Sequence, residues 1–319
     1  MVNAPHVISG DRPFWPDQLS KAVGNLVLEQ ILTAPADKCS DYALQHSLKN
    51  KISCCGTGLH SGAKVSMTLL PASPNTGIVF RRTDADGNGL EIAAHVDNVV
   101  DDRMCTTLGD GNGASIATVE HLMAAVAGCG IHNLLIEIDG PEVPILDGSS
   151  VPFVRGIIQR GLRQLAAPVM AFEVLKTITV QDGDAVATIS PADTLRIDFE
   201  IDFADAAIGH QQKTLVMNNG SFARELCDSR TFCRRADVEA MRANGLALGG
   251  TAENAVVVDG AAILTPGGLR HADEPVRHKM LDALGDLALA GAPLLGHYTG
   301  YRAGHSLTNT LLRALFATP

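Results

Sequence analysis

Carboxylates and a histidine recur at a spacing that suits a metal site. His278, Asp282 and Asp286 follow one another at four-residue intervals, so on a helix they share one face, opposite a stripe of apolar residues. An i, i+4 spacing lets one helix present an imidazole and a carboxylate to a single cation. The same pattern is also typical of a solvated helix with a His–Asp pair, and periodicity alone favours that second interpretation.

A second histidine follows a glutamate at the start of an earlier helical pattern. His121 lies off the apolar stripe, and Glu120 beside it could act on whatever His121 holds. Taken alone, a surface histidine beside a first-turn glutamate is the commoner explanation. Together, the two segments supply two histidines and one carboxylate as ligands, an open position for water, and a carboxylate to accept its proton. That set is the minimum for a catalytic zinc site.

A third histidine, His305, opens the last helical pattern of the chain. A lone histidine at such a position is more often a capping or packing residue than a catalyst. Beside a metal site it becomes a candidate acid, and Asp286 could orient its ring through the second nitrogen.

Hydrophobic periodicity assigns these residues to the elements of an α+β fold. Apolar residues three and four apart predict helices over residues 118–127, 151–159, 276–290 and 305–316. Alternating or continuous apolar runs predict strands from residue 64 onward and over residues 78–80, 133–138, 172–180, 195–203 and 293–298.

The order of these elements suggests a repeat. Each half has a histidine-bearing helix, a strand and a second helix, which indicates two related sheet-plus-helix domains packed together with the active site at their junction. We predict a first domain over residues 47–167 and a second over residues 168–319. Residues 1–46 are interpreted as an extension of unknown role, with a short apolar stretch at residues 26–32.

Composition excludes several classes of function. The net charge of −10 disfavours general nucleic-acid binding, and no apolar run reaches the 18 residues that a membrane helix needs. The seven cysteines contain no CxxC pair and are interpreted as reduced thiols, which together with the absence of a signal-like N-terminus predicts a cytoplasmic protein. The glycine-rich stretch at residues 56–62 precedes a strand, so the sequence has no Rossmann fingerprint, and it has no Walker A or GxSxG motif.

In order along the chain, a set of short motifs resembles the UDP-3-O-acyl-N-acetylglucosamine deacetylase family, the zinc amidases that commit substrate to lipid A synthesis. The motifs are Cys55-Gly56-Thr57-Gly58-Leu59-His60-Ser61-Gly62, Pro74-Asn75-Thr76-Gly77, Arg81-Arg82-Thr83-Asp84, Thr118-Val119-Glu120-His121-Leu122, Pro144-Ile145-Leu146-Asp147-Gly148-Ser149, Ser229-Arg230-Thr231-Phe232, Leu248-Gly249-Gly250, Val276-Arg277-His278-Lys279-Met280-Leu281-Asp282 and Gly304-His305. The resemblance runs from about residue 50 to the C-terminus.

The resemblance implies a ligand set and a base. Zn²⁺ would be held by His121, His278 and Asp282, with water in the open position, where the metal lowers the pKa of that water toward neutrality. Glu120 would remove the water proton. The same ligand set also suits iron(II), so the sequence leaves the physiological metal open.

The remaining implied roles concern the substrate. His305, oriented by Asp286, would stabilise the intermediate and donate a proton to the leaving amine, and Thr231 would donate a hydrogen bond to the developing oxyanion. Lys279 and Phe232 would contact the sugar-nucleotide portion.

The substrate implied is a UDP-linked acylated amino sugar. Its diphosphate needs local positive charge, which we expect from Arg230, Arg277 and Lys279. Its acyl chain needs an apolar passage, for which the resemblance implies residues 235–250, with Val238, Met241, Leu246 and Leu248. Such a substrate implies transient membrane proximity without an integral membrane segment, and the sequence indicates no oligomeric state.

Two further hypotheses stay open at this level. One is a non-catalytic protein of the same fold that binds a sugar nucleotide or lipid, and the unexplained extension motivates it. The other is a metal-dependent amidase that acts on a different N-acetyl sugar.

Overall fold

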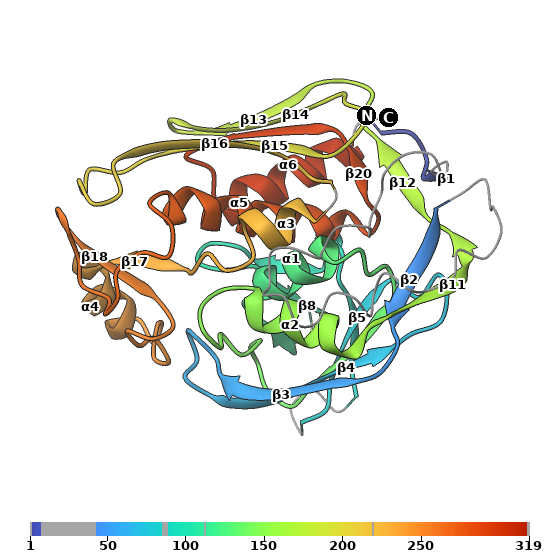
Figure 1. Ribbon diagram of the computed structural model, residues 1–319, viewed down its shortest axis with the longest axis horizontal. Coiled ribbons are helices and arrows are strands. Elements are labelled where there is room, and N and C mark those ends of the chain that lie inside the picture. The colour runs from blue at the N-terminus through green and yellow to red at the C-terminus, as the bar shows by residue number, and fades with distance from the viewer. Residues whose placement is uncertain (1, 8–42, 85–88, 112, 219, 318–319) are drawn as a thin grey trace.

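The computed structural model describes residues 2–7, 43–84, 89–111, 113–218 and 220–317. Two sheets form the outer layers, and the main helices lie between them (Figure 1). In that view β13, β14, β15 and β16 lie along the top, β3 and β4 along the bottom, and α5, α1 and α2 between. The chain is a mixed α+β protein, as its periodicity predicts.

The first sheet has the strand order β3-β4-β10-β5-β6. Its central strand β10 (Leu134–Ile138) pairs antiparallel with β4 (Lys64–Pro71) and parallel with β5 (Ile78–Arg82). Along β4 the buried residues alternate with more exposed ones, which confirms the predicted half-buried strand. The outer strands are β3 (Ile52–Thr57) and β6 (Glu91–Ala93).

The second sheet repeats this arrangement with the order β13-β14-β21-β15-β16. Its central strand β21 (His297–Tyr301) pairs antiparallel with β14 (Ala185–Ser190) and parallel with β15 (Arg196–Asp202). The outer strands are β13 (Ile178–Asp182) and β16 (His210–Val216). In both sheets the central strand comes after a histidine-bearing helix in the sequence. β10 follows the helix with His121, and β21 follows the helix with His278.

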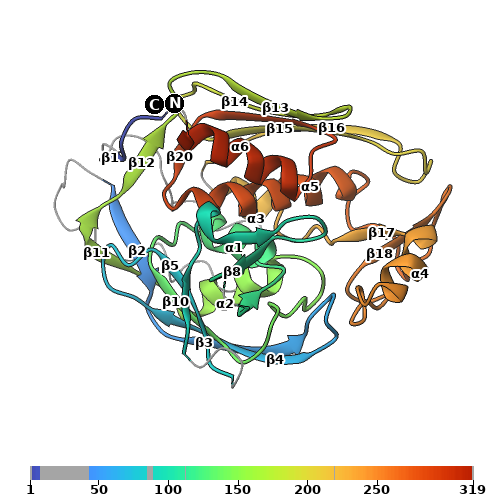
Figure 2. The same cartoon turned by 180° about the vertical axis from the view of Figure 1, so that it is seen from behind.

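The four predicted helices are present as α1 (Glu120–Gly128), α2 (Val151–Arg160), α5 (Glu274–Leu287) and α6 (His305–Ala317). Pro275 in the first turn of α5 needs no N–H partner, and Gly291, at a φ of 80°, ends the 3-10 turn η3 (Ala288–Ala290) that continues the helix. From behind, α6 covers β13 and β14 (Figure 2).

Two predicted strands are each divided in the structure, so those predictions were wrong in detail. Residues 172–180 form the end of β12 (Met170–Glu173) and the start of β13, and residues 293–298 form β20 (Leu294–Leu295) and the start of β21. β12 pairs with β20 on one side and with β1 (His6–Val7) on the other, in a separate sheet. A change of sheet leaves the apolar run unbroken, so periodicity alone cannot reveal it.

The part of the chain predicted as an extension also contributes strands. β2 (Leu44–Leu48) begins inside it and pairs with β11 (Leu162–Pro168), and β1 pairs with β12. The apolar stretch at residues 26–32 lies outside the described residues.

The remaining elements are short. They are η2 (Val96–Asn98), β7 (Val99–Asp101), β8 (Thr107–Gly109), β9 (Ser115–Ile116), α3 (Ser221–Glu225), β17 (Phe232–Arg234), α4 (Arg235–Ala243), β18 (Val256–Asp259) and β19 (Ala262–Ile263). α4, β17 and β18 lie together at the left of Figure 1, and α4 has no buried residue.

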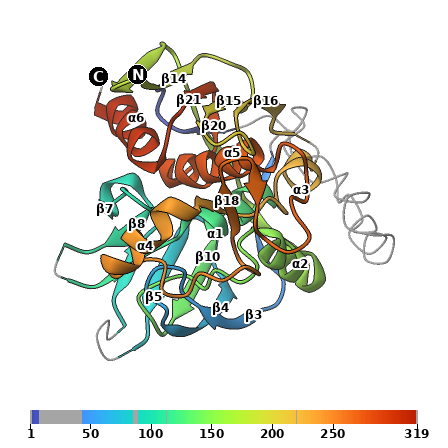
Figure 3. The same cartoon turned by 90° about the vertical axis from the view of Figure 1, so that its left-hand side faces the viewer.

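α1 and α5 cross at very close range because α5 has a glycine at the contact (Figure 3). A Cβ at Gly285 would lie 2.1 Å from the main-chain oxygen of Glu120. This close approach brings the residues around Glu120 next to those around Asp282.

We expect Gly285→Ala to lower the free energy of unfolding by about 1–3 kcal/mol, since backbone must shift to admit the methyl group. Chemical denaturation measures the change. Gly156→Ala is the matched control, because that helical glycine would meet only the side chain of Ile52, at 3.2 Å. Equal stabilities of the two variants would contradict the expectation.

Candidate metal and catalytic site

The three predicted metal ligands meet between α1 and α5. The Nε2 atoms of His121 and His278 lie 3.5 and 3.2 Å from Asp282 Oδ1, and the ligand atoms of all three residues lie within 4.8 Å of one another. Each residue is at most 5% exposed. The interpretations of His121 as a surface residue and of the α5 polar face as solvated were therefore wrong, because packing against α1 buries that face.

The chemistry of this group fits a cation. Asp282 Oδ1 is buried and has no hydrogen-bond partner, although an isolated buried carboxylate oxygen is costly. The main-chain oxygen of Ser229 lies 3.0 Å from His278 Nδ1, which leaves Nε2 turned toward Asp282. A carbonyl that accepts from one ring nitrogen is the usual way to aim the other at a metal. The buried His-His-Asp group could therefore bind a metal ion.

Burial and neighbouring groups set the protonation of His278 and Asp282. It lowers the pKa of His278 to about 4, so the ring is neutral and its lone pair is available at neutral pH. Burial alone would raise the pKa of Asp282, but its electrostatic interactions with the His278 ring and the Lys279 ammonium outweigh it and hold the pKa well below its usual range. Neutral imidazoles and an ionised carboxylate are the forms that bind metals.

Glu120 lies beside the ligands at the start of α1. The turn before it is sharp, since Thr118 has a φ of 57° and its hydroxyl donates to Glu142. The Glu120 Oε2 atom accepts a hydrogen bond of 3.0 Å from the main-chain N–H of Thr106. Burial raises the pKa of Glu120, with His305 and His121 acting against it. A carboxylate with a raised pKa suits a proton acceptor near neutral pH.

His305 and Asp286 form the pair that the sequence suggests. His305 Nδ1 lies 2.9 Å from Asp286 Oδ2, and His305 Nε2 lies 3.9 Å from Glu120 Oε1. Burial alone would lower the pKa of His305, but Asp286 and Glu120 outweigh it and raise the pKa to about 9. The ring is therefore a cation at neutral pH and has a proton to donate.

Two of the other predicted site residues, Phe232 and Lys279, contact this group. Phe232 packs edge-on against the ring of His278, with centroids 6.2 Å apart. Thr231 is half-buried, and its main-chain N–H donates to Gly148. Lys279 Nζ lies 3.0 Å from Asp282 Oδ2, so its ammonium contacts a predicted metal ligand.

Two predicted phosphate-binding arginines are engaged elsewhere. Arg230 is 6% exposed and makes charge-assisted hydrogen bonds to Glu274. Arg277 pairs with Glu225 and Asp273. Both guanidinium groups are thus paired with carboxylates, and their contact with the diphosphate stays a prediction, because sequence proximity to a motif does not show which carboxylate a folded arginine meets.

The Arg230–Glu274 pair instead supports the segment that carries Ser229 and Thr231. Burial alone would raise the pKa of Glu274, but hydrogen bonds from Arg230 and from the main-chain N–H of Arg270 outweigh it and hold the pKa below its ordinary value of 4.5. The pair's stabilisation is thus fully present above about pH 4.5 and is lost as pH falls through the lowered native pKa.

We expect Glu274→Gln to lower the free energy of unfolding at pH 7 by about 3 kcal/mol, because Arg230 stays buried without its counter-charge. The difference from the original protein should be fully present above about pH 4.5 and should shrink as the pH falls further, through the lowered native pKa of Glu274. Urea unfolding across that range measures it, with the exposed Glu253→Gln as control. A difference that stays constant with pH would contradict the assigned charge.

Sequence reasoning missed Thr106 and Ser229, which hold Glu120 and His278. Ser229 lies in the Ser229-Arg230-Thr231-Phe232 motif, which indicated that this segment belongs to the site. Thr106 precedes the short strand β8 and has no periodic pattern around it. Its partners are distant in the chain, and one sequence alone does not identify them.

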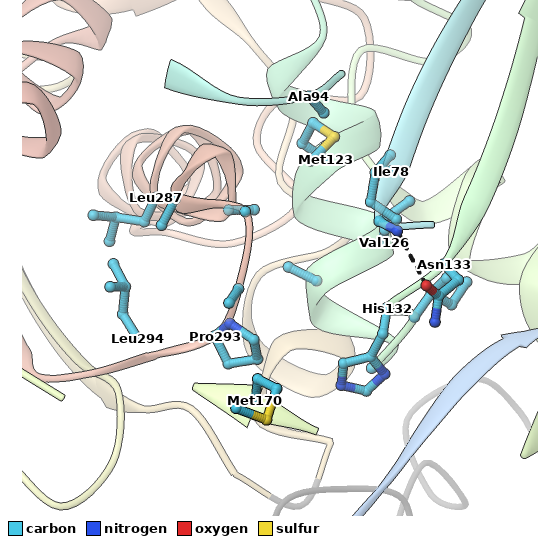
Figure 4. Close-up of a pocket in the computed structure, with 18 of the residues that line it drawn as sticks. Ile78, Ala94, Met123, Val126, His132, Asn133, Met170, Leu287, Pro293 and Leu294 are labelled. Carbon is cyan, nitrogen blue, oxygen red and sulfur yellow. Dashed lines mark hydrogen bonds between the residues drawn. The ribbon is translucent and has the colours of Figure 1, made fainter. Parts of the chain in front are cut away.

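A cavity of about 680 Å³ lies beyond the site, between the later turns of the same helices. Figure 4 shows four residues that line this cavity: Met123 and Val126 on α1, Leu287 on α5, and His132. Burial lowers the pKa of His132 to about 3, so the ring is neutral. None of the three metal-group residues lines this cavity.

No helix within the described residues is long and apolar enough to cross a membrane.

Comparisons with known proteins agree on one family. The family model described as UDP-3-O-acyl N-acetylglycosamine deacetylase matches residues 45–317. A UDP-3-O-acyl-N-acetylglucosamine deacetylase from Phenylobacterium zucineum is 47% identical over 275 residues, which cover 86% of this chain and 94% of that protein. Proteins of the same name from Myxococcus xanthus and a Shewanella species are 48% and 45% identical, again over 86% of this chain and over 87% and 90% of those proteins.

Proposed function

Because the chain belongs to the UDP-3-O-acyl N-acetylglycosamine deacetylase family, we propose that it hydrolyses the N-acetyl group of UDP-3-O-acyl-N-acetylglucosamine, the committed step of lipid A biosynthesis. Water adds to the acetyl carbonyl, the C–N bond breaks, and the products are acetate and the free amine. The observation that carries this proposal is the buried group of His121, His278 and Asp282, with Glu120 and His305 beside it.

The proposed metal is zinc, held by the two imidazoles and the carboxylate. The partnerless Asp282 Oδ1 and the neutral His278 support this assignment. When bound, zinc would polarise the acetyl carbonyl and lower the pKa of a water molecule.

In the proposed mechanism Glu120 accepts the proton of the attacking water. Its raised pKa and its fixed Oε2 support that role. His305 carries a proton at neutral pH and delivers it to the amine nitrogen as the C–N bond breaks, while Asp286 holds the ring through Nδ1. A base and an acid whose pKa values are tuned by their surroundings are typical of such sites.

We propose that Thr231 donates to the developing oxyanion and that Lys279 and Phe232 contact the sugar nucleotide. Val238, Met241 and Leu246 are half-buried and Leu248 is 54% exposed, so these apolar side chains are available to the acyl chain, as the passage requires. A domain division near residue 167 remains part of the proposal. The free thiols of the described cysteines support a cytoplasmic setting.

Metal removal tests the function. We expect acetate release from UDP-3-O-acyl-N-acetylglucosamine to disappear when the protein is chelated and to return with one equivalent of zinc. Refilling with iron(II) under anaerobic conditions distinguishes the two metals. Substrates without UDP or without the acyl chain serve as specificity controls.

Each alternative has its own outcome. Stoichiometric zinc and tight substrate binding without acetate release would indicate a binding protein and contradict the enzymatic function. Equal activity on the truncated substrates would indicate a different amidase.

A further inference from the structure

Thr106 hydrogen-bonds to two carboxylates of the site, Glu120 and Asp286. It is fully buried just before β8. Its main-chain N–H donates to Glu120 Oε2 at 3.0 Å, and its hydroxyl donates to Asp286 Oδ1 at 2.6 Å. One residue thus contacts both Glu120 and the aspartate that holds His305.

Thr106 is itself held from both halves of the chain. Its main-chain oxygen accepts a hydrogen bond of 3.2 Å from the N–H of Val119, directly before Glu120. Its hydroxyl accepts one of 3.3 Å from Asn309 Nδ2, one turn after His305 on α6. The main-chain N–H and oxygen of Thr106 are both hydrogen-bonded, which fixes the residue. Because the hydroxyl accepts from Asn309, its own hydrogen points to Asp286.

The contacts close a ring. Glu120 lies 3.9 Å from His305, His305 lies 2.9 Å from Asp286, and Thr106 connects Asp286 back to Glu120. Asp286 uses one carboxylate oxygen for His305 and the other for Thr106, so the hydroxyl determines how the carboxylate is rotated. That rotation in turn determines where His305 Nε2 points relative to Glu120.

We propose that Thr106 is a positioning residue, whose hydroxyl fixes Asp286 so that His305 faces the same substrate atoms as Glu120. The inference rests on the proposed deacetylase function. It assigns Thr106 no contact with substrate or metal. Its action is through Asp286.

Two substitutions separate the hydroxyl from the shape of the side chain. Thr106→Val keeps the branched shape and the N–H that holds Glu120 but removes the hydroxyl, whereas Thr106→Ser keeps the hydroxyl. We expect Thr106→Val to lower kcat about 10- to 100-fold, a typical loss for a residue that orients a catalytic group, with KM and zinc content within about twofold. Thr106→Ser should recover most of kcat.

A double-mutant cycle tests the route of action. Asp286→Ala removes the proposed intermediary, so adding Thr106→Val should lower kcat by less than about twofold further. Ser47→Ala is the control for a buried hydroxyl lost elsewhere, since Ser47 bonds only main-chain groups of the first domain in its described contacts. It should reduce thermal stability without reducing kcat.

The outcomes are distinct. Full kcat in Thr106→Val, equal losses in the Val and Ser variants, or additive losses with Asp286→Ala would each overturn the inference. If Thr106→Val fails to fold, Thr106→Ser and Thr106→Cys supply the comparison, and the weak thiol donor should reduce kcat more than the hydroxyl does. If the original protein itself released no acetate, the proposed function would be contradicted instead.

Discussion

Replacing Glu120 with glutamine should reduce kcat about 10²- to 10⁴-fold while the protein keeps a full equivalent of zinc. The amide has the same shape and accepts the Thr106 N–H through its oxygen, but it cannot take up a proton at neutral pH. Glu120 lies one residue from His121 and is not in the metal group, so metal binding should survive. Steady-state acetate release and metal analysis on the same preparation measure both quantities.

The matched control for this experiment is Glu137→Gln. Glu137 lies on β10 and pairs with Arg81 at the surface, so the same chemical change there should leave kcat within about twofold. If Glu120→Gln retained full activity, Glu120 would not be the base. If Glu120→Gln lost zinc as well as activity, Glu120 would instead be a structural support of the metal group.

The second large effect is expected from Asp282→Asn. The amide oxygen is a weaker ligand than a carboxylate, so zinc content after dialysis should fall well below one equivalent. Substitution of a residue that only orients a metal ligand typically lowers metal affinity or activity 10- to 100-fold. Loss of a ligand itself should therefore lower kcat about 100-fold or more. Added zinc should restore activity only in part.

Lys279 requires a separate control because it contacts Asp282. Lys279→Met removes the ammonium but keeps all three ligands, so this variant should retain zinc and show a raised KM for the nucleotide substrate. Retention of stoichiometric zinc by Asp282→Asn would show that the buried carboxylate is not a ligand. Zinc loss in Lys279→Met would show that the ammonium is needed to keep the group assembled.

Much of the local structure is determined by sequence alone. The four helices and the alternating strand β4 follow from residue periodicity, because the side of an element that packs against the core must be apolar wherever the chain is folded. The four-residue spacing of His278, Asp282 and Asp286 also requires that they share a helix face. The types of these residues already indicate metal and proton-transfer chemistry.

Tertiary structure decided which face was buried and which residues meet. α5 has polar residues where a solvated face was expected, and they are buried where Gly285 lets the backbone of α1 approach closely. The bond between Thr106 and Asp286 joins residues 180 positions apart, and that between Asn309 and Thr106 joins residues 203 positions apart. Such pairs have no local signature.

The same physical reason accounts for the ion pairs of Arg230 and Arg277, which the sequence did not predict. A guanidinium group can pair with any nearby carboxylate, and the fold places Glu274 beside Arg230, and Glu225 and Asp273 beside Arg277. The sequence alone determined the elements and the chemistry of their side chains, since both depend on neighbours within a few residues. The distances that make these side chains a site depend on how the two sheet-plus-helix units pack, so they are a property of the folded chain.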